Sequence, residues 1–70
     1  MKVDKKKLKD RIEIYELNHM GLRHHSGAFI IVRNLRLTKK LIKCDILAYH
    51  GEDNYMERYN DIEYPTKEFI

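Results

Sequence analysis

The 70-residue chain has a single cysteine, a single proline and no tryptophan. What the sequence lacks excludes several kinds of site and several classes of protein. One cysteine, Cys44, excludes an internal disulfide and a cysteine-based zinc site. No apolar run approaches the roughly 20 residues that a membrane-spanning helix needs. The charged start of the chain lacks the apolar segment of a signal peptide. We therefore expect one small cytoplasmic domain, a monomer or a weak homodimer with no membrane partner.

Recognisable catalytic and metal-binding patterns are also missing. Four histidines are present, but neighbours such as His24 and His25 point opposite ways on an extended backbone, and no carboxylate or thiol stands at a ligand-like spacing from them. Ser26 lies beside His25 without an orienting acid or an oxyanion hole. We expect Cys44 to be a buried thiol that packs as a small hydrophobic side chain. The sequence therefore predicts no enzyme, no metal site and no cofactor.

Positive charge is abundant instead, and it gathers in two segments. The formal net charge is +3 at pH 7, with one cluster of lysines in residues 1–9 and another basic cluster from Arg33 to Lys43. Lysine and arginine that neutralise phosphates release counterions, and aromatic rings nearby stack on exposed bases. The sequence thus predicts a nucleic-acid-binding surface built from both segments: Arg33, Arg36, Lys39, Lys40, Lys43, Lys6 and Lys7.

The segment from Glu52 to Glu68 is acidic and aromatic by comparison. Tyrosine, methionine and arginine are enriched at protein interfaces. The predicted surface for a protein partner therefore consists of Tyr55, Met56, Arg58 and Tyr59. Abundant Lys, Ile, Asn and Tyr are typical of AT-rich coding, which fits a phage-type accessory protein.

Short alternating runs predict several strands. "RIEIYELN" (11–18) is rich in β-branched residues, and a helical stripe through it is broken, which favours a strand over a helix. "AFIIVRN" (28–34) is the most apolar run and predicts a central strand. Residues 42–49 alternate with a period of two, and after the turn "HGEDN" residues 55–60 do so again. "NDIEYP" (60–65) predicts a single tight turn that Asp61 can cap, and Pro65 prevents the sheet pairing from continuing far.

These expected elements favour an all-β fold. Short strands at roughly ten-residue spacing, separated by turn signals, predict a small barrel, because closing the sheet removes its exposed edges. We expect a basic lead-in over residues 1–9 and a single five-stranded barrel over residues 10–70. The alternative is an α+β fold whose N-terminal helix is capped by Asp4.

The order of parts resembles an SH3-like barrel of the KOW or Tudor type. "LKDRIEIYEL" (8–17) stands where such domains have their first strand, and "GLRHHSGAFIIV" (21–32) is similar to their loop-glycine-strand unit. "CDILAYHGEDNYMERYNDIEYP" (44–65) resembles their closing hairpin, one-turn 3₁₀ helix and last strand. The resemblance implies a five-stranded barrel with that helix before the last strand. Such barrels serve as adaptors, nucleic-acid clamps and inhibitors, so the resemblance does not fix the function.

Together these features predict a non-catalytic binding module. The first hypothesis is an accessory factor that contacts nucleic acid, or the machinery that processes it, through the basic surface. The alternative is a protein-binding adaptor or inhibitor that uses the Tyr/Met/Arg face. Salt dependence separates them, because phosphate binding weakens steeply as salt rises.

Overall fold

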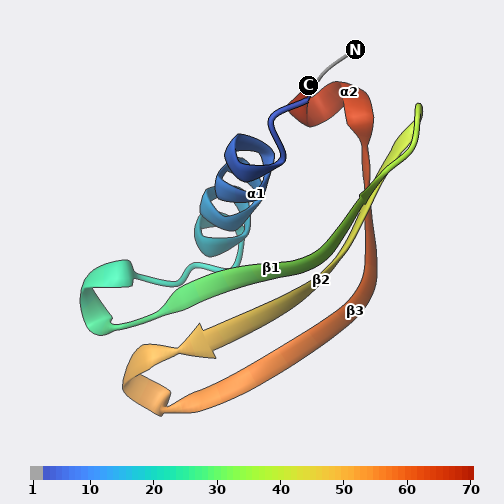
Figure 1. Cartoon of the computed structure of the whole chain (residues 1–70). Coiled ribbons are helices and arrows are strands. Elements are labelled where there is room, and N and C mark those ends of the chain that lie inside the picture. The colour runs from blue at the N-terminus through green and yellow to red at the C-terminus, as the bar shows by residue number, and fades with distance from the viewer. Residues whose placement is uncertain (1–2) are drawn as a thin grey trace.

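A computed structural model describes residues 3–70, and Figure 1 shows a helix, three strands and a last short helix. Helix α1 spans Lys5–His19, and strands β1, β2 and β3 span Phe29–Leu37, Leu41–His50 and Tyr55–Pro65. Helix α2 is the single turn Thr66–Phe69, and two 3₁₀ turns, η1 (His24–Ser26) and η2 (Gly51–Asp53), precede β1 and β3. The strands form one antiparallel sheet in the order β1-β2-β3.

Helix α1 replaces the first predicted strand. The predicted N-cap is confirmed, because Asp4 Oδ1 accepts the backbone N–H groups of Lys6 and Lys7 at 3.0 and 3.2 Å. The strand predicted over "RIEIYELN" is wrong. The buried stripe of α1 is Leu8, Ile12 and Glu16, so a carboxylate occupies a position where the helical pattern calls for an apolar residue.

The three later strands were located correctly, but they are longer than predicted. Asn34 in β1 and Asp61 in β3 take positive φ values of 54° and 55° and sit where the pairing register shifts. Each is a bulge, at which a strand bends and continues. The tight turn predicted at "NDIE", and the 3₁₀ helix that the resemblance implies before the last strand, are therefore wrong, since residues 60–63 belong to β3. Likewise, the strand predicted to end at Asn34 continues to Leu37.

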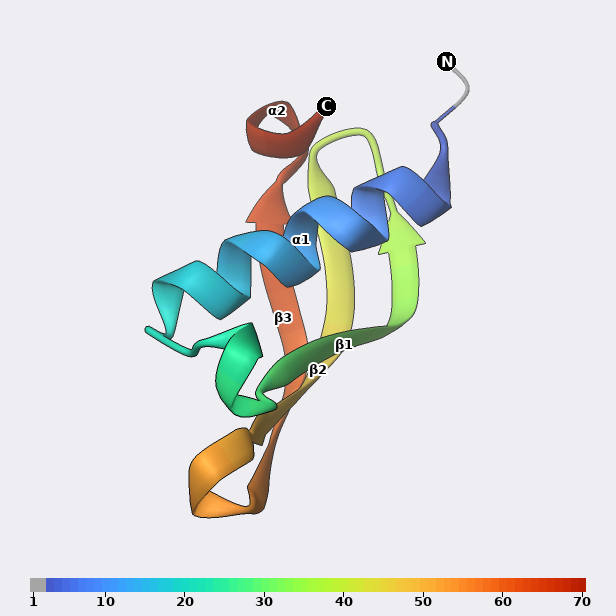
Figure 2. The same cartoon turned by 90° about the vertical axis from the view of Figure 1, so that its left-hand side faces the viewer.

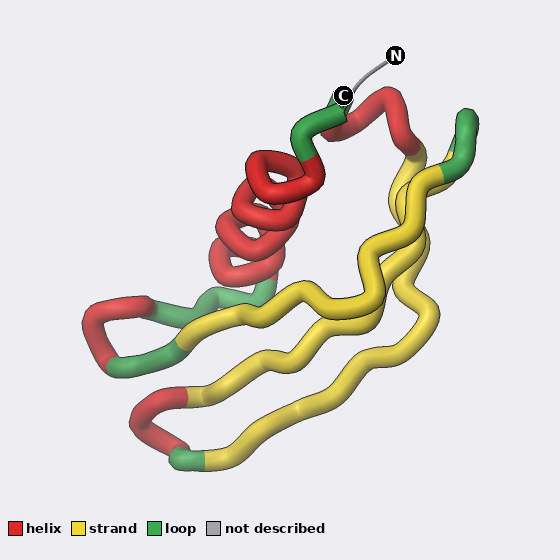
Figure 3. Tube along the Cα trace, viewed as in Figure 1, coloured by secondary structure: helices red, strands yellow, loops and turns green. Residues whose placement is uncertain are grey.

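The five-stranded barrel is wrong, and the molecule has the α+β layout of the alternative prediction. Figure 2 shows α1 lying across one face of an open three-stranded sheet. The strands curve around that helix, as the tube in Figure 3 makes clear, so the face under α1 is concave and the opposite face convex. The core lies between α1 and the concave face, and its largest fully buried side chains are Ile12, Ile42, Ile46 and Cys44.

Helix α1 also protects one edge of the sheet. Glu13 Oε2 accepts the backbone N–H of Val32 at 2.9 Å, which satisfies a donor on the outer edge of β1. Leu8, in the second turn of α1, belongs to the core. The boundary expected between residues 9 and 10 therefore falls inside α1, and residues 5–9 are part of the folded unit.

Candidate nucleic-acid interface

No helix of residues 3–70 covers the convex face of the sheet, and we call it the open face. Successive residues of a strand point to opposite faces, so the buried positions of β2, from Ile42 to Ala48, define the covered face and the residues between them define the open one. The register extends this assignment to the neighbouring strands. The open face consists of Phe29, Ile31, Arg33, Arg36, Leu41, Lys43, Asp45, Leu47, Tyr49, Met56, Arg58, Asn60, Glu63 and Pro65.

One end of the open face is apolar and aromatic. Phe29, Tyr49 and Met56 are paired across the three strands, and Phe29 and Met56 are 43% and 49% exposed. The rings of Phe29 and Tyr49 stack with their centroids 5.0 Å apart and their planes 29° apart. Ile31 and Leu47, half-buried, form the next pair along the strands. This end therefore exposes an apolar surface to solvent.

Cationic side chains occupy the middle of the open face. Arg33 lies opposite Asp45 and Arg58 lies opposite Leu47, and both arginines are exposed. Neither forms an ion pair with any residue between 3 and 70. The two line a shallow hollow of about 250 Å³, together with Asp45, Leu47 and Asn60. They are thus charges without a partner, beside an apolar surface.

Towards the β1–β2 turn, two more cations of the open face form weak surface ion pairs. Arg36 lies 3.7 Å from Asp61, and Lys43 lies 3.7 Å from Glu63. All four side chains are largely exposed, and such pairs contribute little to stability. Arg36 and Lys43 therefore remain available to an anion that reaches this part of the face.

Asp45 has a structural role between these cations. Its Oδ1 accepts the backbone N–H of Asp61 at 3.0 Å, and its Oδ2 accepts Asn34 Nδ2–H at 2.7 Å. These two hydrogen bonds, the Asp61 bond above all, hold the pKa of the carboxyl below its ordinary value. One side chain on the central strand thus ties together the bulges of both outer strands.

The remaining predicted cations lie away from the open face. Lys39 and Lys40 are exposed at the β1–β2 turn, while Lys6 and Lys7 are exposed on the first turn of α1, which covers the other side of the sheet. The structure thus brings together Arg33, Arg36 and Lys43 from the predicted set. It adds Arg58, which the sequence had assigned to the protein-binding set.

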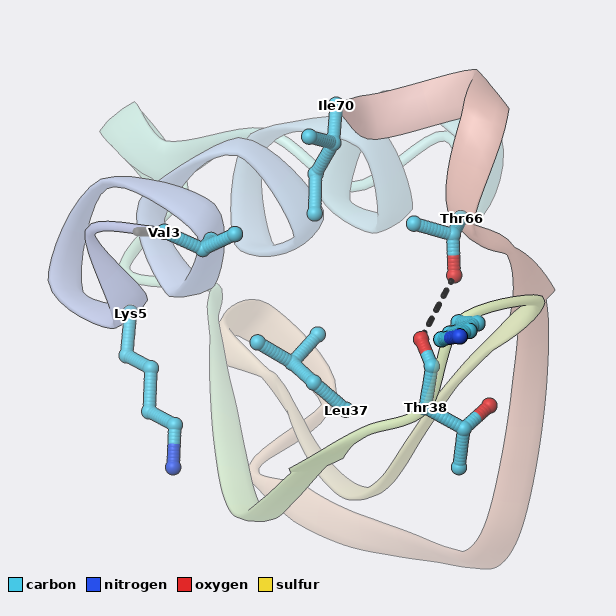
Figure 4. A pocket seen from close by; sticks show the side chains of 7 residues that line it. Val3, Lys5, Leu37, Thr38, Thr66 and Ile70 are labelled. Carbon is cyan, nitrogen blue, oxygen red and sulfur yellow. Dashed lines mark hydrogen bonds between the residues drawn. The ribbon is translucent and has the colours of Figure 1, made fainter. Parts of the chain in front are cut away.

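A larger cavity of about 550 Å³ opens between the start of α1, the β1–β2 turn and α2 (Figure 4). Three of its lining side chains are apolar, Val3, Leu37 and Ile70, and Lys5 and Lys39 also line it. Its wall is held by a weak hydrogen bond of 3.4 Å from the Thr66 hydroxyl to the Thr38 carbonyl. This cavity lies on the helix side of the molecule, and it is separate from the cations of the open face.

The predicted protein-binding residues divide between the two faces. Met56 and Arg58 lie on the open face, whereas Tyr55 and Tyr59 point to the side of α1. There, Glu57 accepts the Tyr59 hydroxyl at 2.8 Å and lies 2.5 Å from His50 Nε2, and the Tyr55 ring stacks on His50 at 4.3 Å. The Tyr59 hydrogen bond is the main cause that lowers the pKa of Glu57. These contacts stabilise the β2–β3 hairpin at the end where η2 connects its two strands.

Other reactive groups are buried or scattered. Cys44 is fully buried as expected, and burial raises the pKa of its thiol to about 11. His24 and His25 lie edge to face in η1. Over residues 3–70 no three His, Cys, Asp or Glu side chains are placed to hold a metal ion. In the same part of the chain no helix is long and apolar enough to span a membrane.

Comparisons with known proteins provide no further guide. No family model, curated protein or solved structure matches the chain. They therefore do not test the resemblance to KOW and Tudor barrels.

Sequence reasoning missed the aromatic part of the interface. Phe29 and Ile31 alternate with Ile30 and Val32 in β1, just as Leu47 and Tyr49 alternate with Ile46 and Ala48 in β2. Both faces of these strands are therefore apolar, although a chain with one long helix can cover only one of them. That excess of apolar residues is the signal, within the sequence, of a second apolar surface that stays exposed.

Proposed function

We propose that this protein is a non-catalytic binding module that contacts nucleic acid, or the machinery that processes it, through the open face. The observation that carries the proposal is that Arg33 and Arg58 line one hollow of a face that no helix of residues 3–70 covers, and that both are exposed and form no ion pair with a described residue. The cations Arg33, Arg36, Lys43 and Arg58 outnumber the carboxylates beside them, which are Asp45, Glu63 and Asp61, the ion-pair partner of Arg36. Arginine forms bidentate hydrogen bonds with phosphate, which suits it to this task.

The charge balance of the open face also supports anion binding. Asp45 is engaged by two hydrogen bonds at the bulges, and Glu63 and Asp61 lie in surface ion pairs with Lys43 and Arg36. Each of these carboxylates therefore already has a partner, while Arg33 and Arg58 form no ion pair with any residue between 3 and 70. A polyanion would supply those partners and release its counterions.

The test is a titration of the purified protein with mixed-sequence single-stranded and duplex oligonucleotides at low and moderate salt. We expect binding that weakens steeply with salt, and an Arg33→Ala/Arg58→Ala variant whose log–log salt slope is smaller by about 1 for each lost phosphate contact. The matched control is Lys6→Ala/Lys7→Ala, which removes the same charge from α1, on the other side of the sheet.

Two results would count against the proposal. One is the absence of binding to either oligonucleotide at low salt. The other is an equal loss of affinity in both double variants, because that would show general charge attraction without a site on the open face.

A second candidate function is protein binding, and the row Phe29–Tyr49–Met56 favours it. Aromatic residues and methionine are enriched in the cores of protein interfaces, and Phe29 and Met56 are both more than two-fifths exposed. Such an interface would be insensitive to salt and would be weakened by Met56→Ala.

A further inference from the structure

The stacked pair Phe29–Tyr49 is held in place from within the protein. The two residues face each other across β1 and β2, and the Tyr49 hydroxyl donates to Asn54 Oδ1 at 2.5 Å. Asn54 in turn closes the β2–β3 connection, where its backbone N–H bonds the His50 carbonyl at 2.8 Å. Both rings are therefore oriented before any ligand arrives, which lowers the entropic cost of binding to them.

The rings and the arginines lie within the reach of one nucleotide chain. Arg58 follows Met56, the partner of Tyr49, by two residues along β3, and Arg33 follows Phe29 by four along β1. A strand rises about 3.3 Å per residue, so these positions are roughly 7 and 13 Å from the aromatic row. A chain that runs along the strands can thus place a base on the rings and its following phosphates near Arg58 and Arg33.

Only a single strand can use both parts of this surface. Bases in a duplex stack on one another and present only their edges in the grooves, so their flat faces are closed to aromatic side chains. A duplex would therefore touch the arginines and leave the aromatic row exposed. The open face is also convex, so it does not enclose a double helix, whereas a flexible single strand follows such a surface (Figures 1 and 3).

We infer that the open face binds single-stranded nucleic acid in preference to duplex, with bases stacked on the Phe29–Tyr49 pair and phosphates held by Arg58 and Arg33. This inference rests on the function proposed above and names its substrate class. Stacking tolerates every base, so little sequence preference is expected.

Three probes of equal length test it: a mixed-sequence single strand, the same strand annealed to its complement, and an abasic strand that keeps only the sugar–phosphate chain. Fluorescence anisotropy at low salt should show the tightest binding for the single strand. Phe29→Ala should weaken that binding about 5- to 150-fold, the fold-change equivalent of losing one stacked base. Its affinity for the abasic strand and the duplex should stay unchanged.

A matched control and a second variant keep the test decisive. Tyr55→Ala removes a ring of similar exposure from the other side of the sheet and should leave single-strand binding unchanged. Phe29→Trp preserves the stacking surface and gives the chain its only tryptophan. Its emission should be quenched by the single strand and not by the abasic strand, even if Phe29→Ala does not fold.

The outcomes separate the two proposals. Equal affinity for single strand and duplex, an unaffected Phe29→Ala variant, or a tryptophan that the single strand does not quench would overturn the stacking inference. Loss of binding in Arg33→Ala/Arg58→Ala would then still support nucleic-acid binding. No binding to any of the three probes would overturn both.

Discussion

The two faces of strand β2 differ in nearly every respect, although they alternate along the same ten residues. On the covered face Ile42, Cys44 and Ile46 are at most 1% exposed beneath α1. On the open face the intervening residues are only half-buried, and charged and apolar side chains mix. One face of a single sheet is thus buried in folding, while the other stays exposed and is the face through which we propose that the protein binds.

The covered face also contains one polar contact that the open face does not need. The Tyr64 hydroxyl donates to Glu16 between β3 and α1, and both residues are buried. A buried carboxylate without such a donor would be strongly destabilising. On the open face, by contrast, water solvates the charged groups, so Arg33 and Arg58 need no partner in the protein.

The difference between the two faces is tested most strongly by removing a side chain that joins α1 to the covered face. Ile12 is fully buried and Ile14, two residues later on the same helix, is 62% exposed. We expect Ile12→Ala to lower the free energy of unfolding by about 2–5 kcal/mol, because it removes buried contacts and leaves a cavity. Urea unfolding followed by circular dichroism measures this.

Ile14→Ala is the matched control, since it deletes the same atoms from the same helix. We expect a change within about 0.5 kcal/mol, because exposed substitutions away from special features have little effect. Similar losses in both variants would contradict the placement of α1 on the sheet.

Alkaline pH probes the covered face with a smaller expected effect. Burial, the largest cause, raises the pKa of Cys44 from 9.0 to about 11, so the folded protein keeps the thiol proton after the unfolded chain has lost it. The stabilisation is complete below pH 9 and is lost as the pH rises through 11, which amounts to about 3 kcal/mol. Unfolding free energies measured between pH 8 and pH 11 should therefore decline.

Cys44→Ala isolates this contribution, because the tyrosines and lysines that also titrate are kept. Its stability should decline less over the same interval, whatever its value at neutral pH. An identical decline in both proteins would show that the thiol is accessible in the folded state.

The sequence predicted three of the strands because the patterns that indicate them lie within short segments of the chain. Alternation in residues 42–49 and the turn at "HGEDN" need no knowledge of the rest of the chain. The sequence did not predict α1 because Ile14 and Leu17 point away from the helical stripe that begins at Leu8 and Ile12. In the structure the buried stripe continues at Glu16, whose carboxylate is satisfied by Tyr64, 48 positions away. Similarly, the strands continue through bulges at Asn34 and Asp61, and Asp45 on the middle strand holds both bulges.

The candidate site was predictable only in part. Residue type identified Arg33, Arg36 and Lys43 as candidates for binding an anion, and strand alternation would have placed Met56 and Arg58 on a face apart from Tyr55. What the sequence does not contain is the register, which sets Arg58 and Arg33 on the same face as Phe29 and Tyr49. Register depends on pairing between strands, and here the two bulges shift it.

The smallest expected change in stability compares two neighbouring residues of the open face, Asp45 and Arg33. Asp45 fastens both bulges, whereas Arg33, its cross-strand neighbour, forms no ion pair within residues 3–70. We expect Asp45→Ala to lower the urea midpoint at pH 7 and Arg33→Ala to leave it unchanged. Since the pKa of Asp45 is lowered in the folded protein, its contribution is present above the ordinary carboxyl range and is lost as the pH falls through the lowered value. The gap between wild type and Asp45→Ala should therefore close in acid, and a gap that persists there would show that the carboxylate charge is not what holds the bulges.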